Sequence, residues 1–196
     1  MLGEVTQPSL LSRVRDWSDQ VAWTEFEAKY RSLIVRYCRR CGLQTSDAED
    51  VRQLVMIKLA KSLPDFVYDA ARGRFRDYLY SALRSAISDA MARPNRARET
   101  VFPNGLDGVA TASGEADNRW EEEWAAHHYR LAMDQVKRDF EPSSVDAFEK
   151  LLAGGNVAAV ATALALSEQA VHKAKQRIRN RLRELIEAQV KEEDRV

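Results

Sequence analysis

The chain has 196 residues, of which 45% are apolar and 31% are charged, and its 30 basic and 30 acidic side chains balance to a net charge of zero. This composition is typical of a core-forming protein with a polar surface, built as one domain or two small ones, and no apolar run is long enough to predict a membrane span. The two cysteines do not make a disulfide framework, and the N-terminus lacks the apolar centre of a secretion signal, so we expect a cytoplasmic protein.

The balanced total hides an uneven distribution of charge. Residues 74–98 hold six Arg and two Asp, and residues 168–188 hold six basic and three acidic side chains. Residues 107–123 hold six acidic side chains and one Arg. Two basic zones separated by an acidic stretch predict binding to a polyanion.

Three amphipathic helices are expected in the first half of the chain, because apolar side chains recur there at steps of three and four residues. Gly42 is placed to end the first helix, and Pro64 and Pro94 stop the next two. Ser46 and Glu49 have the spacing of a capping box at the start of the second. The three expected helices cover residues 20–41, 45–63 and 75–93.

A linker and a second group of helices are expected after them. Residues 94–118, which include this linker, hold two prolines and three glycines and have no apolar period. Ser143 or Ser144 is expected to cap a helix that starts at Val145, and Gly154 and Gly155 are expected to close it. The other expected helices cover residues 119–140, 156–164 and 168–188.

The sequence therefore predicts an all-α protein in which two small helical domains are joined by a flexible acidic linker. Trp120 and Trp124 are expected to pack in the second domain. The expected divisions are an N-terminal extension without an assigned role at 1–20, a first domain at 21–95, the linker at 96–119 and a second domain at 120–190.

The last expected helix has an unusual charge pattern. Every second residue from Lys173 to Arg183 is basic, a period that is usual for a strand. As a strand, however, the opposite face would be half polar and poor in β-branched residues. As a helix, the segment gains an apolar stripe at steps of three and four residues: Val171, Ala174, Ile178, Leu182 and Leu185. A helix is therefore expected.

On a helix, steps of two residues place the cations alternately on two ridges. One ridge holds Lys173, Arg177 and Arg181, and the other holds Lys175, Arg179 and Arg183. Between them lie neutral hydrogen-bonding side chains: Gln169, His172, Gln176 and Asn180. This arrangement suits a DNA major groove, with cations toward phosphates and amides toward base edges. With Ser167 as its N-cap and a short helix before it, the segment predicts a helix-turn-helix; the alternative is a salt-bridged surface helix.

Three segments together resemble the sigma-70 family. They are "TSDAEDVRQLVMIKL", "RGRFRDYLYSALRSAISDAMAR" and "VAAVATALALSEQAVHKAKQRIRNRLREL". Their order and spacing are similar to the small, two-domain sigma factors of the extracytoplasmic-function group. The resemblance implies a region 2 helical bundle and a region 4 helix-turn-helix, which bind core RNA polymerase and promoter DNA without enzymatic activity, a cofactor or a metal. An anti-sigma factor is a further partner that the resemblance allows.

The resemblance also implies roles for individual residues. Those implied in core polymerase binding are Asp50, Gln53, Leu54 and Ile57, although Leu54 departs from the usual acidic residue there. Those implied at the minus-ten element are Arg74, Phe75, Tyr78, Arg84, Ser85, Ser88 and Arg93, together with a base-capturing loop at 69–74. Those implied at the minus-thirty-five element are Gln169, His172, Lys173, Gln176, Arg177, Arg179 and Asn180.

Several alternatives stay open on the sequence alone. Phe75 is as readily a core residue as a base-stacking one. Cys38 and Cys41 have the spacing of a zinc or redox motif, but no second such pair exists and no thioredoxin-like pattern surrounds them. A free-standing helix-turn-helix regulator that acts without polymerase, or an adaptor that sequesters a regulator, would be a different class of protein.

Overall fold

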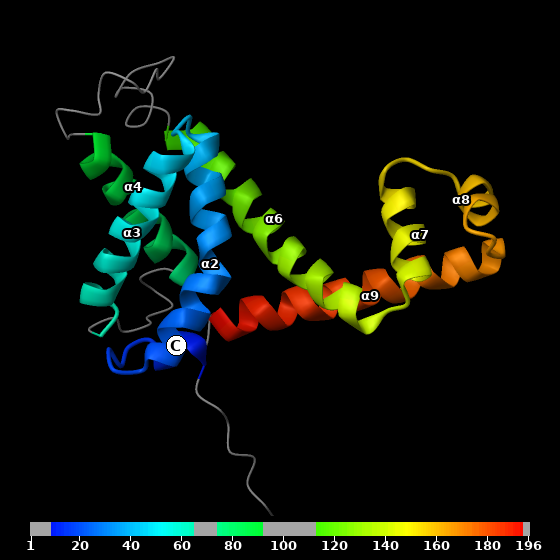
Figure 1. The fold of residues 1–196 in the computed structure, drawn as a ribbon, viewed down its shortest axis with the longest axis horizontal. Helices are drawn as coiled ribbons and strands as arrows, with labels where there is room; N and C mark the ends of the chain where they lie inside the picture. The colour runs from blue at the N-terminus through cyan, green and yellow to red at the C-terminus, as the bar shows by residue number, and fades with distance from the viewer. Residues whose placement is uncertain (1–8, 65–73, 92–112, 194–196) are drawn as a thin grey trace, which may run out of the picture. The chain divides into compact units, whose positions relative to one another are not determined.

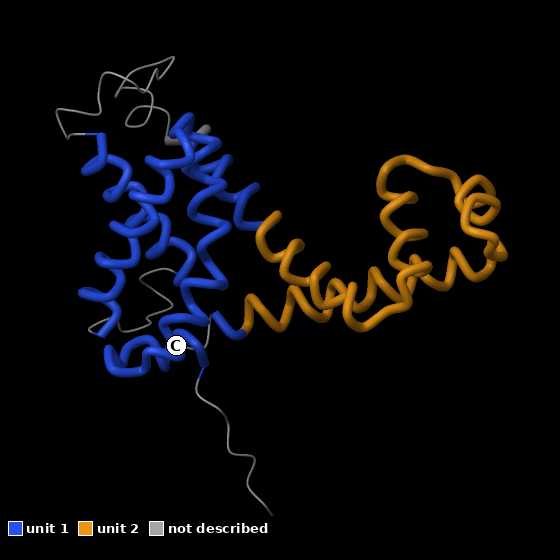
Figure 2. Tube along the Cα trace, viewed as in Figure 1, with its two compact units in different colours: residues 1–125, 192–196 blue, residues 126–191 orange. Residues whose placement is uncertain are grey.

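The computed structural model describes residues 9–64, 74–91 and 113–193. Within these ranges the chain is built of helices and turns, with no strand, and it separates into two compact units. Figure 2 colours the first unit, residues 1–125 and 192–196, apart from the second, residues 126–191. The predicted all-α, two-unit fold is confirmed. None of the described helices has the length and apolar content needed to cross a membrane.

The first unit is a helical bundle. It contains α1 (Leu10–Arg13), α2 (Gln20–Arg40), α3 (Thr45–Ser62), α4 (Phe75–Met91) and the first part of α6 (Ser113–Asp139). Helix α3 packs against both α2 and α4, as Figure 1 shows. The aromatic rings of Phe26, Tyr30 and Phe75 meet in the core, with centroids 4.7–6.0 Å apart. Gly42 follows the end of α2 with a φ of 90°, so its predicted role is confirmed.

The predicted capping box of α3 is wrong. Its N-cap is Gln44, which makes no side-chain capping bond. Glu49 instead accepts hydrogen bonds from Arg31, at 2.8 Å, and from Arg52, at 2.6 Å. Arg31 first, and then Arg52, hold the pKa of Glu49 below its usual value. The carboxylate therefore links α3 to α2 and does not reach back to Ser46.

The start of the chain, left without a role on sequence, belongs to the first unit from Ser9 onward. Helix α1 is capped by Ser9, whose hydroxyl accepts from the Ser12 amide at 3.1 Å. Leu11 and Val14 are buried in the same core as α2, α3 and α4. The predicted division at residue 20 is therefore not a structural boundary.

Helix α6 corrects the predicted linker and the predicted role of its tryptophans. The helix begins at Ser113, so the last part of the 96–119 linker is helical. Trp120 stacks on Tyr80 with centroids 5.1 Å apart and meets Tyr37 edge-on at 5.4 Å, while Trp124 lies 6.4 Å from Tyr30. Both indoles therefore pack in the first unit, because aromatic rings of α2 and α4 provide the apolar surface they need.

The acidic residues beside Trp120 also face the first unit. Arg76 donates to Glu121 at 2.7 Å, and Arg40 donates to Glu122 at 2.5 Å. These acidic side chains thus pair with arginines of α2 and α4.

The second unit combines the rest of α6 with three helices. They are α7 (Pro142–Leu152), α8 (Val157–Ala163) and α9 (Glu168–Glu193), the last of which belongs to this unit as far as Lys191. The predicted caps Ser143 and Ser144 of α7 are wrong, since Glu141 is the N-cap. Pro142 explains the earlier start, because its fixed φ suits the first helical position, where no amide donor is needed.

Replacing Trp120 by Ala is predicted to destabilise the first unit by about 3–5 kcal/mol, the usual cost of removing a large buried ring. Hydrogen exchange of the full chain should show amide protection lost in α2 and α4 and retained in α7 to α9. Leu152→Ala is the control, because Leu152 is 60% exposed in the second unit. Protection lost only in the second unit would show that Trp120 packs there.

Candidate functional site

Helix α3 presents a narrow mixed surface on the side away from its core contacts. Its core face is the buried row Ala48, Val51, Val55 and Leu59. Gln53 is exposed and Ile57 is 51% exposed, one helical turn further on, while Asp50 lies half-buried a turn before Gln53. Three of the four residues predicted to bind polymerase therefore share one face of α3.

Leu54 has a different environment from the other three. It is partly buried and packs against the core of the first unit. Leu54 therefore packs α3 onto the core. This contact explains why an apolar residue stands where the family resemblance suggests an acidic one.

Phe75 does not lie on the surface of α4. Its side chain is fully buried, and its ring packs edge-on to Phe26 at 6.0 Å and tilted to Tyr30 at 5.4 Å. Stacking on a DNA base would require this core to open. The predicted contact of Phe75 with DNA is therefore replaced by a role in the core.

Other residues predicted at the minus-ten element do reach the surface of α4. Arg74, Ser85 and Ser88 are exposed. Tyr78 is half-buried and its hydroxyl bonds that of Ser62 at the end of α3. Arg84 is also half-buried, with its guanidinium 5.6 Å from the centre of the Tyr80 ring. Arg93 and the greater part of the loop 69–74 lie outside the described residues.

Lys58 joins this surface from the neighbouring helix. Its ammonium donates to the Ser85 hydroxyl at 2.9 Å and pairs with Asp89 at 2.8 Å. No sequence pattern marks this residue, because the contact depends on how α3 and α4 pair in space. The α4 surface thus contains a cation that comes from α3.

Helix α9 has the architecture that its sequence predicts. Val171, Ala174, Ile178 and Leu182 are buried, and the neutral residues between the ridges are exposed. All seven residues predicted to face the minus-thirty-five element are exposed: Gln169, His172, Lys173, Gln176, Arg177, Arg179 and Asn180. Gln176 also donates to Asn180 at 3.1 Å, so the two amides on this face are already oriented by one another.

The two basic ridges of α9 are not equivalent. On one ridge, Arg177 lies over the Phe140 ring at 5.4 Å and Arg181 binds Asp139 at 2.9 Å. On the other, Lys175, Arg179 and Arg183 are exposed and form no ion pair within the described ranges. The second ridge is therefore the better placed to bind an external polyanion.

A short turn connects α8 to α9. Asn156 caps α8 by accepting from the Ala159 amide at 2.8 Å. Ser167 caps α9 by accepting from the Ala170 amide at 3.1 Å, as predicted. Between the helices, Ala165 adopts a φ of 52°, which is a left-handed conformation rare for a residue with a Cβ.

The cysteine pair shows neither a metal site nor an activated thiol. Cys38 is buried and burial raises its pKa, and burial raises that of Cys41 as well. A thiol with a raised pKa is a poor nucleophile and a poor metal ligand at neutral pH. Among the described residues, no three His, Cys, Asp or Glu side chains gather as metal ligands.

Comparison with known families bears on the first unit. Residues 28–97 match the family model described as sigma-70 region 2. This segment is therefore similar to sigma-70 region 2. The match begins within α2, contains all of α3 and α4, and covers roughly a third of the chain. It supports membership of the chain in the RNA polymerase sigma-70 family. Neither the comparison with curated proteins nor that with solved structures gives a match.

The surfaces of α3 and α4 lie within the matched residues. Helices α8 and α9, predicted to form a helix-turn-helix, lie beyond the matched residues, so that role stays a prediction.

Ser167→Ala is predicted to destabilise the start of α9 by about 1 kcal/mol, because the Ala170 amide loses its acceptor. Faster hydrogen exchange in the first turn of α9 would show this effect. Ser143→Ala is the matched control: it lies just inside α7 without a capping bond and should change exchange little. Equal effects of the two substitutions would argue against the cap.

Proposed function

We propose that this protein is a sigma factor of the extracytoplasmic-function type, which binds core RNA polymerase, directs it to promoters with a minus-ten and a minus-thirty-five element, and opens the upstream edge of the bubble. The observation that carries the proposal is that a segment matching sigma-70 region 2 occurs together with a second helical unit whose α9 exposes amides between two rows of cations.

In this proposal, α3 is the polymerase-binding helix. Asp50, Gln53 and Ile57 share its outer face, where an exposed isoleucine between polar groups suits a protein partner. Leu54 acts indirectly by packing the helix onto the core.

The surface of α4 is proposed to hold the minus-ten element. Tyr78 is the aromatic residue that can stack on an unpaired base, a contact worth about 1–3 kcal/mol. Arg74, exposed directly before α4, supplies positive charge, and the exposed Ser85 and Ser88 supply hydroxyls. Flipping a base costs a few kcal/mol, so several contacts of this size are needed to hold a strand open.

Helix α9 is proposed to read the minus-thirty-five element. Gln169, His172, Gln176 and Asn180 face base edges, where amides can form paired hydrogen bonds with adenine. Lys175, Arg179 and Arg183 bind phosphates, because they carry no ion pair among the described residues. The Arg177 guanidinium is proposed to contact both DNA and the Phe140 ring.

The first test is transcription in vitro with purified core polymerase and a panel of candidate upstream regions. We expect promoter-specific transcripts that require the protein, and Ile57→Ala should reduce them by weakening core binding. Absence of any specific transcript, together with a footprint of the protein alone on a palindromic site, would instead identify a free-standing helix-turn-helix regulator.

The second test separates reading from anchoring on α9. Gln176→Ala should change the choice among promoters, since a lost base contact costs about 1–3 kcal/mol at one position only. Arg179→Ala should weaken all promoters alike and reduce the salt dependence of binding by about one phosphate contact. Binding of the holoenzyme to promoter variants at several salt concentrations measures both. Uniform effects from both substitutions would contradict the division.

A further inference from the structure

The turn between α1 and α2 exposes a tryptophan. Trp17 is 64% exposed, although an indole is a large apolar group that proteins usually cover. Its neighbours along the chain, Leu11 and Val14, are buried in the core of the first unit. The exposed ring therefore follows a segment that is anchored in the core of the first unit.

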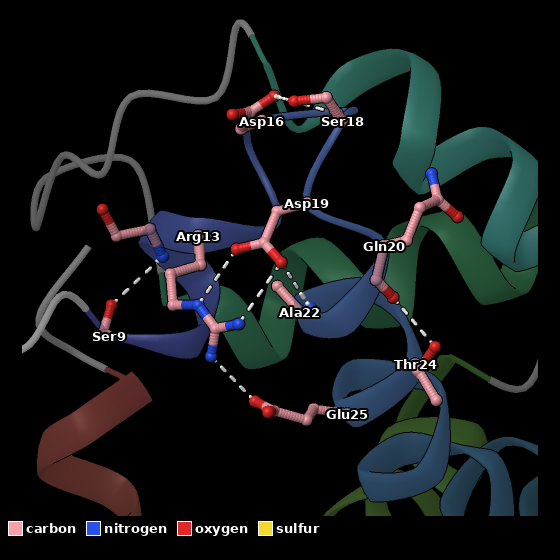
Figure 3. A network of polar contacts seen from close by, with 10 residues as sticks. Ser9, Arg13, Asp16, Ser18, Asp19, Gln20, Ala22, Thr24 and Glu25 are labelled. Carbon is pink, nitrogen blue, oxygen red and sulfur yellow. Dashed lines mark hydrogen bonds and ion pairs between the residues drawn. The ribbon is translucent and has the colours of Figure 1, made fainter.

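Polar contacts fix the base of this turn. Arg13 donates to Asp19 at 3.1 Å and to Glu25 at 2.9 Å, which ties α1 to the first turns of α2. Asp19 also caps α2 by accepting from the Ala22 amide at 2.8 Å. Figure 3 shows Asp19 between Arg13 and the Ala22 amide, with Arg13 also reaching Glu25.

A second set of contacts fixes the tip. The Asp16 carboxylate accepts from the Ser18 amide at 2.9 Å and from its hydroxyl at 2.7 Å, as Figure 3 shows. The Gln20 side chain donates to the carbonyl of Trp17 at 3.2 Å. The backbone that carries the exposed ring is thus held on both sides. Little conformational entropy of this turn would therefore be lost when a partner covers the ring.

Trp17 also forms one wall of a groove. The groove has room for about 290 Å³ and runs from this turn to α3, where its wall is made by Met56, Ile57 and Ala60. Trp23 of α2 lies 6.1 Å from Trp17 and also lines the groove. The lining is mixed, because α2 adds the polar side chains of Gln20, Thr24 and Glu27. A groove with two exposed apolar anchors, Trp17 and Ile57, and polar groups beside them is the kind of surface that accepts an amphipathic helix.

The groove is continuous with the proposed polymerase-binding face, because Ile57 belongs to both. We propose that Trp17 extends this face and that the groove seats an apolar side chain of a core RNA polymerase helix that binds α3. This inference rests on the proposed function and adds to it a binding role for the N-terminal segment. Exposed aromatic residues at the centre of such surfaces commonly carry much of the binding energy.

The test measures the affinity of the full chain for core polymerase. Trp17→Ala should weaken binding about tenfold or more, whereas Trp17→Phe should retain most of it. Val21→Ala is the matched control, because Val21 is 63% exposed near the start of α2 but does not line the groove, and it should bind normally. Ala60→Gln, which fills the groove while leaving Trp17 in place, should weaken binding as Trp17→Ala does.

The outcomes separate this inference from the proposed function. Failure of the unaltered protein to bind core polymerase would overturn both. Normal binding by Trp17→Ala and Ala60→Gln, with weakened binding by Ile57→Ala, would overturn the role of Trp17 alone. Sedimentation of the free protein tests the other occupant of the groove: a dimer that Trp17→Ala disrupts, without loss of polymerase binding, would assign it to a second copy of the chain. Thermal unfolding of each variant shows that any lost affinity does not come from unfolding.

Discussion

Aromatic packing between α2, α4 and the start of α6 holds the first unit together. Tyr30 and Phe75 meet at 5.4 Å, and Trp120 stacks on Tyr80 at 5.1 Å. These contacts fix α4 at its buried side, so its opposite side is free to carry Tyr78, Ser85 and Ser88. The surface proposed to hold an open DNA strand therefore depends on a core that does not itself touch DNA.

The same division of labour recurs on α9. Its buried apolar stripe fixes the helix. One ridge of cations contacts the junction of α6 and α7 through Arg177 and Arg181. The other ridge stays exposed. A helix anchored along one flank presents its amides in a constant orientation, which base reading requires more than raw positive charge. The neutral net charge of the chain is consistent with this, because the binding surfaces are local.

The sequence predicted the elements that depend on local pattern. The helix periods, Gly42 after α2 and the Ser167 cap follow from short-range rules and are confirmed. The failures concern contacts between distant segments. Glu49 binds Arg31 and does not cap the helix at Ser46. Trp120 packs in the first unit because the Tyr37 and Tyr80 rings lie there. Lys58 and Trp17 were missed for the same reason: their roles depend on which helices become neighbours.

The positions of the tryptophans have an optical consequence. All four, at 17, 23, 120 and 124, fall in the first unit, and the second contains none. Fluorescence excited selectively through indole therefore reports on the first unit and gives no signal from α7, α8 and most of α9. The exposed Trp17 would respond to any protein that covers it, while the buried Trp120 would respond to unfolding. The molecule thus carries its own spectroscopic label for one of its two halves.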